Sequence, residues 1–332
     1  MQQGSSLLNN SDWTIIETLP QDGALRSYTR IERNGMRALY MDCGPQDVAT
    51  ATRLAADFIP VCEWLRSLGL RAPEIYEIDL ENNAAIIEDF GTISVKQAIA
   101  NGVDAQQLYK DAAEILKIIQ TADCPLELPN YQTSFMRKAR QRFADWYVPV
   151  LRGKPNPPGF TEEYHALWDE IERGIGPYNE CFMHVDFHVE NLMYLGGQGI
   201  GSLGIIDFQE GMFGPESYDL VNLLEDMRAD VPRDIQEELL TGKSEAYLNW
   251  YRVLGTQFHC RLLGQIIRWA VVEDKRQYMQ YYARLIPYVQ RALEDPVLAP
   301  FKAWLERENI VLEDASTLNW NAARRFIAKD AV

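Results

Sequence analysis

A short stretch from 184 to 191 constrains the fold and the chemistry of this chain more than any other. It reads His-Val-Asp-Phe-His-Val-Glu-Asn and carries a carboxylate at Asp186 and an amide at Asn191. The segment that follows, 192–206, consists of two short apolar runs separated by a glycine-rich turn. Two short strands joined by a tight turn form a hairpin. Such a hairpin places Asn191 and Asp207 at neighbouring ends of its strands.

Asn191 and Asp207 offer oxygen atoms of the kind that Mg²⁺ binds, since this ion combines one or two protein groups with the oxygens of a bound phosphate. The spacing is similar to the catalytic loop of kinases, H-x-D-x-x-x-x-N followed by a metal-binding aspartate. That similarity implies that Asp186 accepts the proton of the attacking hydroxyl group. It also implies that Asn191 and Asp207 are metal ligands, and that the protein mainly aligns the reactants and neutralises charge.

The residues after the loop distinguish this chain from protein kinases. Phe208-Gln209-Glu210 follows the predicted metal ligand, and 214–220 reads Gly-Pro-Glu-Ser-Tyr-Asp-Leu. This pattern resembles the aminoglycoside phosphotransferase and choline kinase superfamily, whose small-molecule kinases carry I-D-F/W and then G-P-x-x-x-D-L. Within it, 206–209 together with 218–221 most resembles the bacterial anomeric amino-sugar kinases. The resemblance covers most of the chain and is strongest over 182–226.

The resemblance implies an α+β, protein-kinase-like fold with two lobes. A small lobe with an antiparallel sheet, residues 1–90, would bind the nucleotide. A larger, mainly helical lobe, residues 91–332, would carry catalysis and substrate binding. ATP and Mg²⁺ are the implied cofactors. The implied acceptor is the anomeric hydroxyl group of N-acetylmuramate or N-acetylglucosamine, as in the recycling of cell-wall sugars.

The nucleotide phosphates call for a cation, which the superfamily places as a lysine on the strand predicted at 36–42. This chain has Met41-Asp42 there, as the amino-sugar kinases tend to have. An arginine can replace the lysine, because guanidinium binds phosphate bidentately. Three arginines on or beside the first strands are candidates: Arg26, Arg30 and Arg37. We select Arg30 as the phosphate-binding residue.

Two further segments acquire a nucleotide role from the resemblance. By position, 19–30 is the loop that covers the nucleotide, although Gly23 is its only glycine. The hinge between the lobes falls at Glu88 to Phe90, where main-chain groups of Glu88 and Phe90 would meet the adenine edge. Recognition there is by the main chain, so the side-chain types carry little information.

Sugar binding requires amide and carboxylate hydrogen bonds and an aromatic face. Gln209, Glu210 and Arg268 are the predicted acceptor-binding residues. Trp146 is a candidate for the aromatic face. A muramic acid carboxylate would need a cation such as Arg140 or Arg268.

Three alternatives stay open. The acceptor can be another small molecule of the same superfamily: an aminoglycoside, choline, homoserine or a fructosamine. The protein can be a nucleotide-binding pseudokinase that acts as an interaction module, because the lysine is missing. A metal-dependent hydrolase can use His184, Asp186 and His188, which would share one face of a strand. We interpret His184 instead as a buried imidazole that hydrogen-bonds the main chain near Asp207.

The net charge and the cysteine content of the chain limit the classes of binding partner that we expect. The formal net charge is −16, which disfavours nucleic acid and anionic membranes, since both attract clustered Lys and Arg. The 5 cysteines form no CxxC pair, which is typical of reduced thiols in a cytoplasmic protein. No apolar run resembles a signal peptide or a transmembrane helix. We therefore expect a small-molecule substrate, while the sequence leaves the oligomeric state open.

Local patterns predict the elements of the first lobe. Apolar residues recur at helical spacing from Val48 to Leu68, and Gly69 is placed as a C-cap. Strands are predicted at 13–16, 28–30, 36–42, 72–78 and 84–87.

Overall fold

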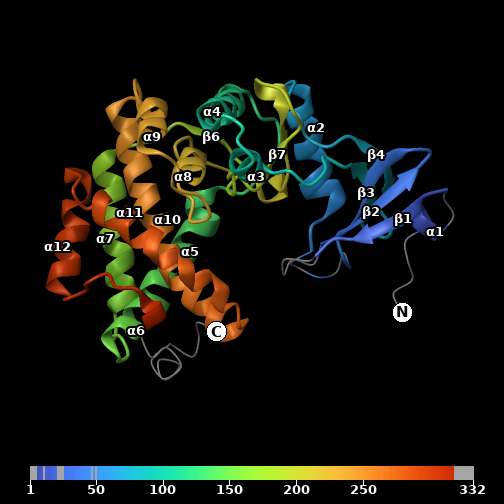
Figure 1. Cartoon of the computed structure of the whole chain (residues 1–332). Helices are drawn as coiled ribbons and strands as arrows, with labels where there is room; N and C mark the ends of the chain where they lie inside the picture. Colours follow the sequence, from blue (N-terminus) through green and yellow to red (C-terminus); the bar gives the residue numbers. More distant parts are fainter. Residues whose placement is uncertain (1–5, 10–11, 21–25, 46–47, 49–50, 318–332) are drawn as a thin grey trace. The chain divides into compact units, whose positions relative to one another are not determined.

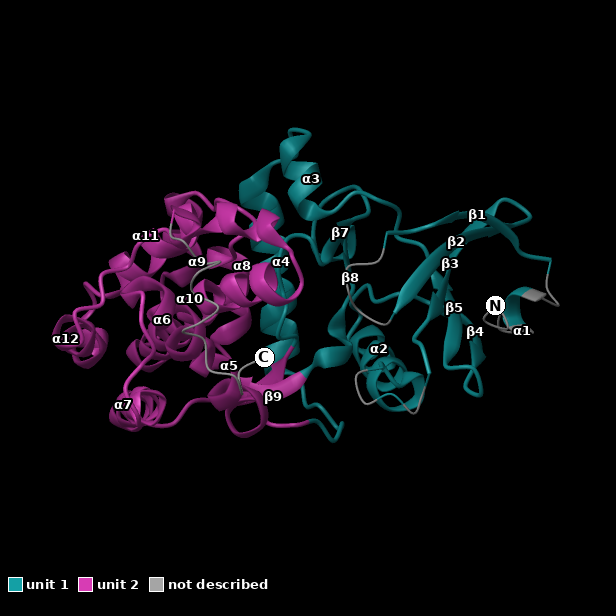
Figure 2. Ribbon diagram, turned by 90° about the horizontal axis from the view of Figure 1, so that it is seen from below, with its two compact units in different colours: residues 1–128, 184–211 teal, residues 129–183, 212–332 magenta. Residues whose placement is uncertain are grey.

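The computed structural model describes residues 6–9, 12–20, 26–45, 48 and 51–317. The chain forms two compact units, each built from two segments (Figure 2). Unit 1 contains Met1–Leu128 and His184–Gly211, and unit 2 contains Pro129–Met183 and Met212–Val332. Each unit is described here by itself.

Unit 1 is built around an antiparallel sheet of 5 strands in the order β1-β2-β3-β5-β4 (Figure 1). The strands are β1 (Thr14–Thr18), β2 (Ser27–Arg33), β3 (Met36–Asp42), β4 (Ile75–Asp79) and β5 (Ala84–Glu88). A tight turn at Asn34 and Gly35 joins β2 to β3, and both residues have positive φ, 52° and 80°. Asn-Gly is the pair that such two-residue hairpin turns favour. The predicted strands are thus present, and the one at 36–42 has the predicted bounds.

One face of this sheet forms a small core. Ala38 and Tyr40 on β3, and Ala84 and Ile86 on β5, alternate with the residues of the opposite face and are buried together with Ile31. The period of two is the reason that these strands could be recognised in the sequence. The short helix α1 (Ser6–Asn9) also contacts β4 and β5.

The helix predicted at 48–68 begins later than expected. A π-helical turn, Leu54–Phe58, leads into α2 (Ile59–Ser67), and the described residues of the segment 48–53 are not helical. The start is set by a distant residue, because the side-chain oxygen of Asn83 accepts the Leu54 N–H at 3.1 Å. Gly69 follows the helix with a φ of 77°, as its predicted role requires.

The predicted catalytic hairpin, β7 (Leu192–Tyr194) and β8 (Leu203–Ile205), belongs to unit 1. Its main chain is bonded to earlier parts of that unit: Tyr194 N–H donates to Ile93 O at 2.8 Å, and Ile205 N–H donates to Arg71 O at 2.7 Å. Helices α3 (Val95–Ala100) and α4 (Ala105–Thr121) complete the unit. These bonds explain why the compact units differ from a division at residue 90. As a division between nucleotide binding and substrate binding, 1–90 and 91–332 stays a prediction.

Unit 2 is mainly helical and is organised around the long helix α10 (Glu245–Val272). This helix packs against the helices Arg137–Arg142, Phe160–Ile175, Tyr218–Glu225 and Tyr282–Ala292 and against the π-helical turn Phe143–Tyr147. A two-stranded ribbon joins β6 (Glu180–Met183) to β9 (Met212–Pro215). The other helices are α5 (Arg137–Arg142), α6 (Val148–Arg152), α7 (Phe160–Ile175), α8 (Tyr218–Glu225), α9 (Arg233–Leu240), α11 (Tyr282–Ala292) and α12 (Ala299–Arg307).

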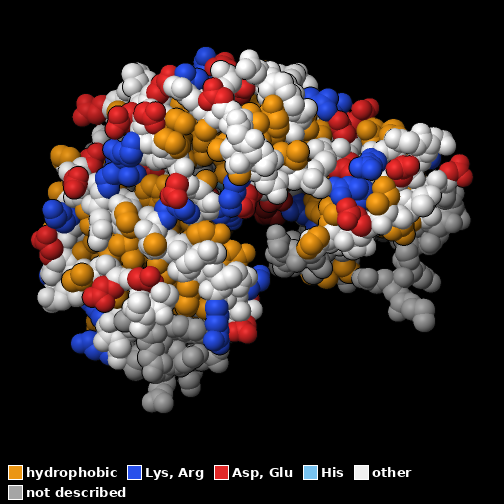
Figure 3. All heavy atoms as spheres, in the orientation of Figure 1, with side chains coloured by type: hydrophobic (Ala, Val, Ile, Leu, Met, Phe, Trp, Pro, Cys, Tyr) orange, Lys and Arg blue, Asp and Glu red, His pale blue; other side chains and the backbone are white. Residues whose placement is uncertain are grey.

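Gly264 explains how closely α10 approaches its neighbour. A Cβ atom at this position would lie 1.9 Å from the main-chain oxygen of Arg142. The absence of a side chain therefore lets two backbones touch. On the face of the molecule that Figure 3 shows, acidic and basic side chains are interspersed. No helix in the described ranges has both the length and the apolar character that crossing a bilayer requires.

Candidate active site

The hairpin brings Asn191 and Asp207 to the same end of its two strands. Leu192 pairs with Ile205, and the Ile206 N–H donates to Asn191 O at 3.1 Å. This confirms the predicted arrangement of the two residues. Asp207 has a φ of 65°, in the left-handed region, and starts a 3₁₀ turn, Phe208–Glu210.

Asp186 and Asn191 are fastened to each other within the loop. The Asn191 Nδ2 donates to the main-chain oxygen of Asp186 at 3.0 Å and lies 3.3 Å from its carboxylate. The Asp186 side chain is 45% exposed, whereas that of His188 is buried, with Nε2 at 3.3 Å from Asp186 Oδ1. The Asp186 carboxylate therefore has a fixed inner side and an open outer side.

Val185 adds backbone strain to this loop. Its φ of 73° is unusual for a β-branched side chain. Strained positions of this kind cluster at functional sites, where the surrounding structure holds them in place. Sequence reasoning did not identify this feature, because a valine carries no local signal for positive φ.

His184 has the structural role that the sequence suggested. Its imidazole is fully buried, and Nε2 lies 2.9 Å from Ile206 O. Burial lowers the pKa of His184, so the neutral ring donates Nε2–H to this carbonyl group. A hydrolase site at 184, 186 and 188 would need the same nitrogens for a metal ion. In the described part of the chain, no three His, Cys, Asp or Glu side chains form a group able to hold a metal ion.

The Asp207 carboxylate is held from two sides. Its Oδ1 accepts a hydrogen bond from Gln209 Nε2 at 2.9 Å and forms an ion pair with Arg26 Nη2. The side chains of Arg26 and Asp207 are 10% and 35% exposed, respectively. Gln209 is buried, so the structure places this predicted acceptor-binding residue as a support for the carboxylate. Its role toward an acceptor stays a prediction.

The three candidate phosphate-binding arginines lie in different surroundings. Arg30 is buried and donates to both oxygens of Asp89, at 2.5 and 3.3 Å, and it also pairs with Glu17. Arg37 is 68% exposed. Arg26 contacts the predicted metal ligand Asp207. This contact joins residues 181 positions apart, and no pattern in the sequence predicted it.

The predicted hinge residues lie where β5 ends. The Glu88 side chain pairs with Arg71 at 2.5 Å, and its N–H donates to Glu74 O at 2.8 Å. The Phe90 ring packs so tightly on Gly204 of β8 that a Cβ there would lie 2.6 Å from the ring. The hinge thus touches the hairpin. The central part of the predicted nucleotide-covering loop, 21–25, lies outside the described residues.

The remaining candidates for acceptor binding separate into exposed and buried residues. Glu210 is exposed in unit 1, and Arg268 on α10 of unit 2 is 25% exposed and pairs with Glu273 at 2.9 Å. Trp146 and Arg140 are buried. The guanidinium group of Arg140 is bonded to Asp169 and Glu172, so neither Trp146 nor Arg140 presents a surface to a sugar.

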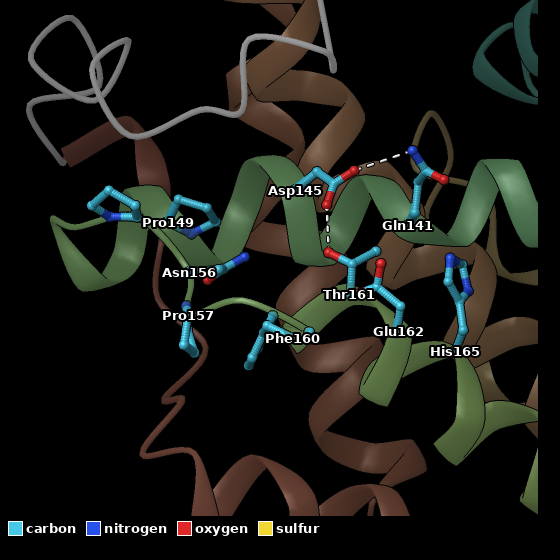
Figure 4. A pocket seen from close by; sticks show the side chains of 11 residues that line it. Gln141, Asp145, Pro149, Asn156, Pro157, Phe160, Thr161, Glu162 and His165 are labelled. Carbon is cyan, nitrogen blue, oxygen red and sulfur yellow. Dashed lines mark hydrogen bonds between the residues drawn. The ribbon is translucent and has the colours of Figure 1, made fainter.

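A pocket of about 450 Å³ lies in unit 2, beside α6 and the start of α7 (Figure 4). Asp145 lies on its wall and accepts hydrogen bonds from Thr161 Oγ1 at 2.7 Å and Gln141 Nε2 at 3.1 Å. Burial raises the pKa of Asp145. None of the predicted site residues lines this pocket.

The sequence of this chain is similar to those of known phosphotransferases. Residues 16–255 match the phosphotransferase enzyme family. An N-acetylmuramate/N-acetylglucosamine kinase of Caulobacter vibrioides is 28% identical, over 88% of this chain and 91% of the relative. A protein of the same name from Pseudomonas putida is 24% identical, over 82% and 81%.

Solved structures are similar in fold. A choline/ethanolamine kinase family protein from Mesorhizobium loti superposes with a TM-score of 0.57, at 14% identity, over 86% of this chain and 91% of that one. The GDP complex of aminoglycoside 2′-phosphotransferase-IIIa gives a TM-score of 0.55, at 14% identity, over 89% and 94%. The predicted α+β, kinase-like fold is thereby confirmed.

Proposed function

Because this chain belongs to the phosphotransferase enzyme family, we propose that it transfers the γ-phosphoryl group of ATP to the anomeric hydroxyl of N-acetylmuramate or N-acetylglucosamine. The protein is a small-molecule kinase. The observation that carries the mechanism is the loop and hairpin that gather Asp186, Asn191 and Asp207. The names of the curated relatives support the acceptor.

In this mechanism Asp186 is the catalytic base. Its carboxylate is about half exposed and is backed by the buried His188, so that the outer side can receive a hydroxyl group. Because the Asn191 side chain donates a hydrogen bond to the main-chain oxygen of Asp186, the Asp186 carboxylate keeps its orientation when the acceptor binds. A base within hydrogen-bond reach of the hydroxyl group removes its proton as the bond to phosphorus forms.

Asn191 and Asp207 are the residues that would hold Mg²⁺. Their amide and carboxylate oxygens fit this ion, which prefers hard oxygen ligands and keeps places for phosphate oxygens. Asp207 is partly exposed, and Gln209 orients its carboxylate. A metal ion held by these residues would supply positive charge that neutralises the charge developing on the nucleotide phosphates.

The nucleotide base would meet main-chain groups of Glu88 and Phe90. We propose that Arg30 acts on nucleotide binding indirectly, because its two hydrogen bonds to Asp89 fix the residue that lies between Glu88 and Phe90. Glu210 and Arg268, which keep exposed surface, are proposed to contact the acceptor. We expect a cytoplasmic enzyme that acts on small molecules and binds neither nucleic acid nor membranes.

The test is ³¹P NMR of the purified protein with MgATP and a panel of acceptors: N-acetylmuramate, N-acetylglucosamine, choline and kanamycin. A new phosphomonoester signal split by the anomeric proton is the expected result with one of the two sugars. The Asp186→Asn variant, which keeps the metal ligands, serves as the control and should give no signal in the same time.

Two other results would change the assignment. A phosphomonoester on choline or kanamycin would keep the reaction and replace the acceptor. MgATP binding without any product would favour the pseudokinase interpretation over catalysis.

A further inference from the structure

We propose that Arg26 binds two anions in turn: the Asp207 carboxylate in the nucleotide-free protein, and the nucleotide phosphates once a metal ion occupies Asp207. The proposal rests on the metal role proposed above for Asp207. It makes the metal ion and Arg26 competitors for one carboxylate. It also gives the phosphates the cation that the missing lysine would have supplied.

The first argument is that the Asp207 Oδ1 atom is already in use. It accepts from Gln209 Nε2 at 2.9 Å and pairs with Arg26 Nη2. A carboxylate oxygen has two lone-pair sites. An ion that binds this oxygen directly must therefore displace one of the two donors.

The second argument identifies Arg26 as the donor that leaves. Gln209 is neutral, and a divalent cation beside its amide group meets no net charge. Arg26 is positive and only 10% exposed, so water screens its repulsion of a second cation a few ångströms away incompletely. The same repulsion acts if the metal ion binds the other oxygen of the carboxylate. Gln209 can therefore stay while Arg26 moves.

The third argument concerns the destination of Arg26. Its side chain is 10% exposed, and a guanidinium group with so little access to water needs an anion nearby. Burial raises the pKa of Tyr28 to about 12 and that of Cys43 to about 12, so neither is an anion near pH 7, whereas the Glu210 carboxyl group also interacts electrostatically with Arg26. The nucleotide phosphates arrive with the metal ion and match the guanidinium fork.

The exchange predicts opposite effects on two equilibria. Without nucleotide, Arg26 occupies the carboxylate and weakens metal binding. With nucleotide, the same residue contributes a contact to phosphate. Metal ion and nucleotide therefore strengthen each other's binding, and the coupling passes through one side chain.

The test measures both equilibria for the wild type and for Arg26→Gln, with no acceptor present. Mn²⁺ is titrated into nucleotide-free protein, and the free ion is read by electron paramagnetic resonance. Isothermal titration calorimetry then gives the affinity for ATP at saturating Mg²⁺. In Arg26→Gln we expect Mn²⁺ to bind about 5-fold more tightly, as loss of one partly exposed ion pair allows. We expect ATP to bind about 10- to 100-fold more weakly, as loss of one charged hydrogen bond implies.

Two further variants make the result specific. Arg37→Gln removes an arginine that is 68% exposed on the adjacent strand, and both affinities should stay at the wild-type values. Arg26→Lys keeps the charge, so Mn²⁺ affinity should return toward wild type while ATP binding is restored in part. This variant also keeps the test informative if Arg26→Gln folds poorly.

The opposite signs distinguish exchange from a structural role. If Arg26→Gln weakened both Mn²⁺ and ATP, or left ATP binding unchanged, the exchange would be refuted. If the wild-type protein bound MgATP but phosphorylated none of the acceptors, the proposed acceptor would fail and the exchange would be judged on these affinities alone.

Discussion

The side-chain amide of Asn191 donates a hydrogen bond to the main-chain oxygen of Asp186, over an Nδ2–O distance of 3.0 Å. One residue thereby closes the loop that carries the proposed base, Asp186, and stands at the start of the hairpin that carries the proposed metal ligands. Its nitrogen serves the loop, and its oxygen is the atom suited to a cation. The proposed base and the proposed metal site are consequently fixed to each other through one amide.

Replacement of Asn191 by Asp should damage the fold of the loop as well as catalysis. The substitution puts an acceptor where a donor faces the Asp186 carbonyl group, and it adds a negative charge 3.3 Å from that residue's carboxylate. We expect a loss of about 1–3 kcal/mol in the free energy of unfolding, measured by urea denaturation at pH 7. An unchanged unfolding midpoint would show that the hydrogen bond contributes little.

Replacement of Asp186 by Asn should separate catalysis from binding. The substitution removes the base but keeps the main-chain oxygen that Asn191 bonds. Turnover should fall by about 10²- to 10⁴-fold, the usual contribution of a general base, while the Kd for MgATP changes little. Initial rates and calorimetry on one preparation check both. A turnover near the wild-type value would exclude Asp186 as the base.

Two glycines in α10 form a matched pair for testing packing. In Gly264→Ala the new Cβ would meet the Arg142 carbonyl oxygen at 1.9 Å, and main chain cannot move aside as a side chain can. We expect a loss of about 2–3 kcal/mol of stability. Gly255→Ala meets only side-chain atoms, the nearest at 3.4 Å, and should be neutral or stabilising by up to about 1 kcal/mol, because alanine favours helix. Thermal unfolding of both variants gives the comparison.

Stability should decrease as the pH falls below about 6.5, the pKa of an unperturbed histidine. Burial lowers the pKa of His165 to about 4 and also lowers the pKa values of His184 and His259. Between the folded-state and the unfolded-state pKa of such a histidine, the unfolded chain binds a proton that the folded protein does not bind, so acid favours unfolding. Each such histidine contributes a slope of up to about 1.4 kcal/mol per pH unit.

Urea denaturation at several values between pH 7.5 and 4.5 measures this dependence. Burial raises the pKa values of Asp145 and Glu172. These carboxyl groups therefore bind protons at a higher pH in the folded protein than in the unfolded chain, which reduces the slope of stability against pH. In His165→Gln the slope should become shallower by the share of one histidine. Equal slopes in the variant and the wild type would contradict the assignment.

The sequence predicted those parts of the molecule that local patterns determine. The strand predicted at 36–42 is β3, and the glycine-rich turn after Leu195 predicted the hairpin that has Asn191 and Asp207 at its end. The role of His184 also followed from its position beside this hairpin.

Contacts between distant residues could not be predicted in this way. The start of the helical segment depends on Asn83, which caps Leu54 from 29 positions away. Between Arg30, which we selected, and Arg26, the sequence offers no pattern that decides which one binds phosphate, because both lie near the same strand. Only the fold shows that Asp89 and Glu17 surround the former and that Asp207 contacts the latter.

The discontinuous first unit has a consequence for protein synthesis. Three groups accept hydrogen bonds from the hairpin: the main-chain oxygens of Ile93 and Arg71 and the Asp111 carboxylate. All three leave the ribosome well before the hairpin itself. Unit 1 therefore cannot finish folding until residue 211 has emerged, although its sheet is available much earlier. A nascent chain that stops before His184 has the sheet but lacks the loop and the hairpin that carry the proposed base and the proposed metal ligands.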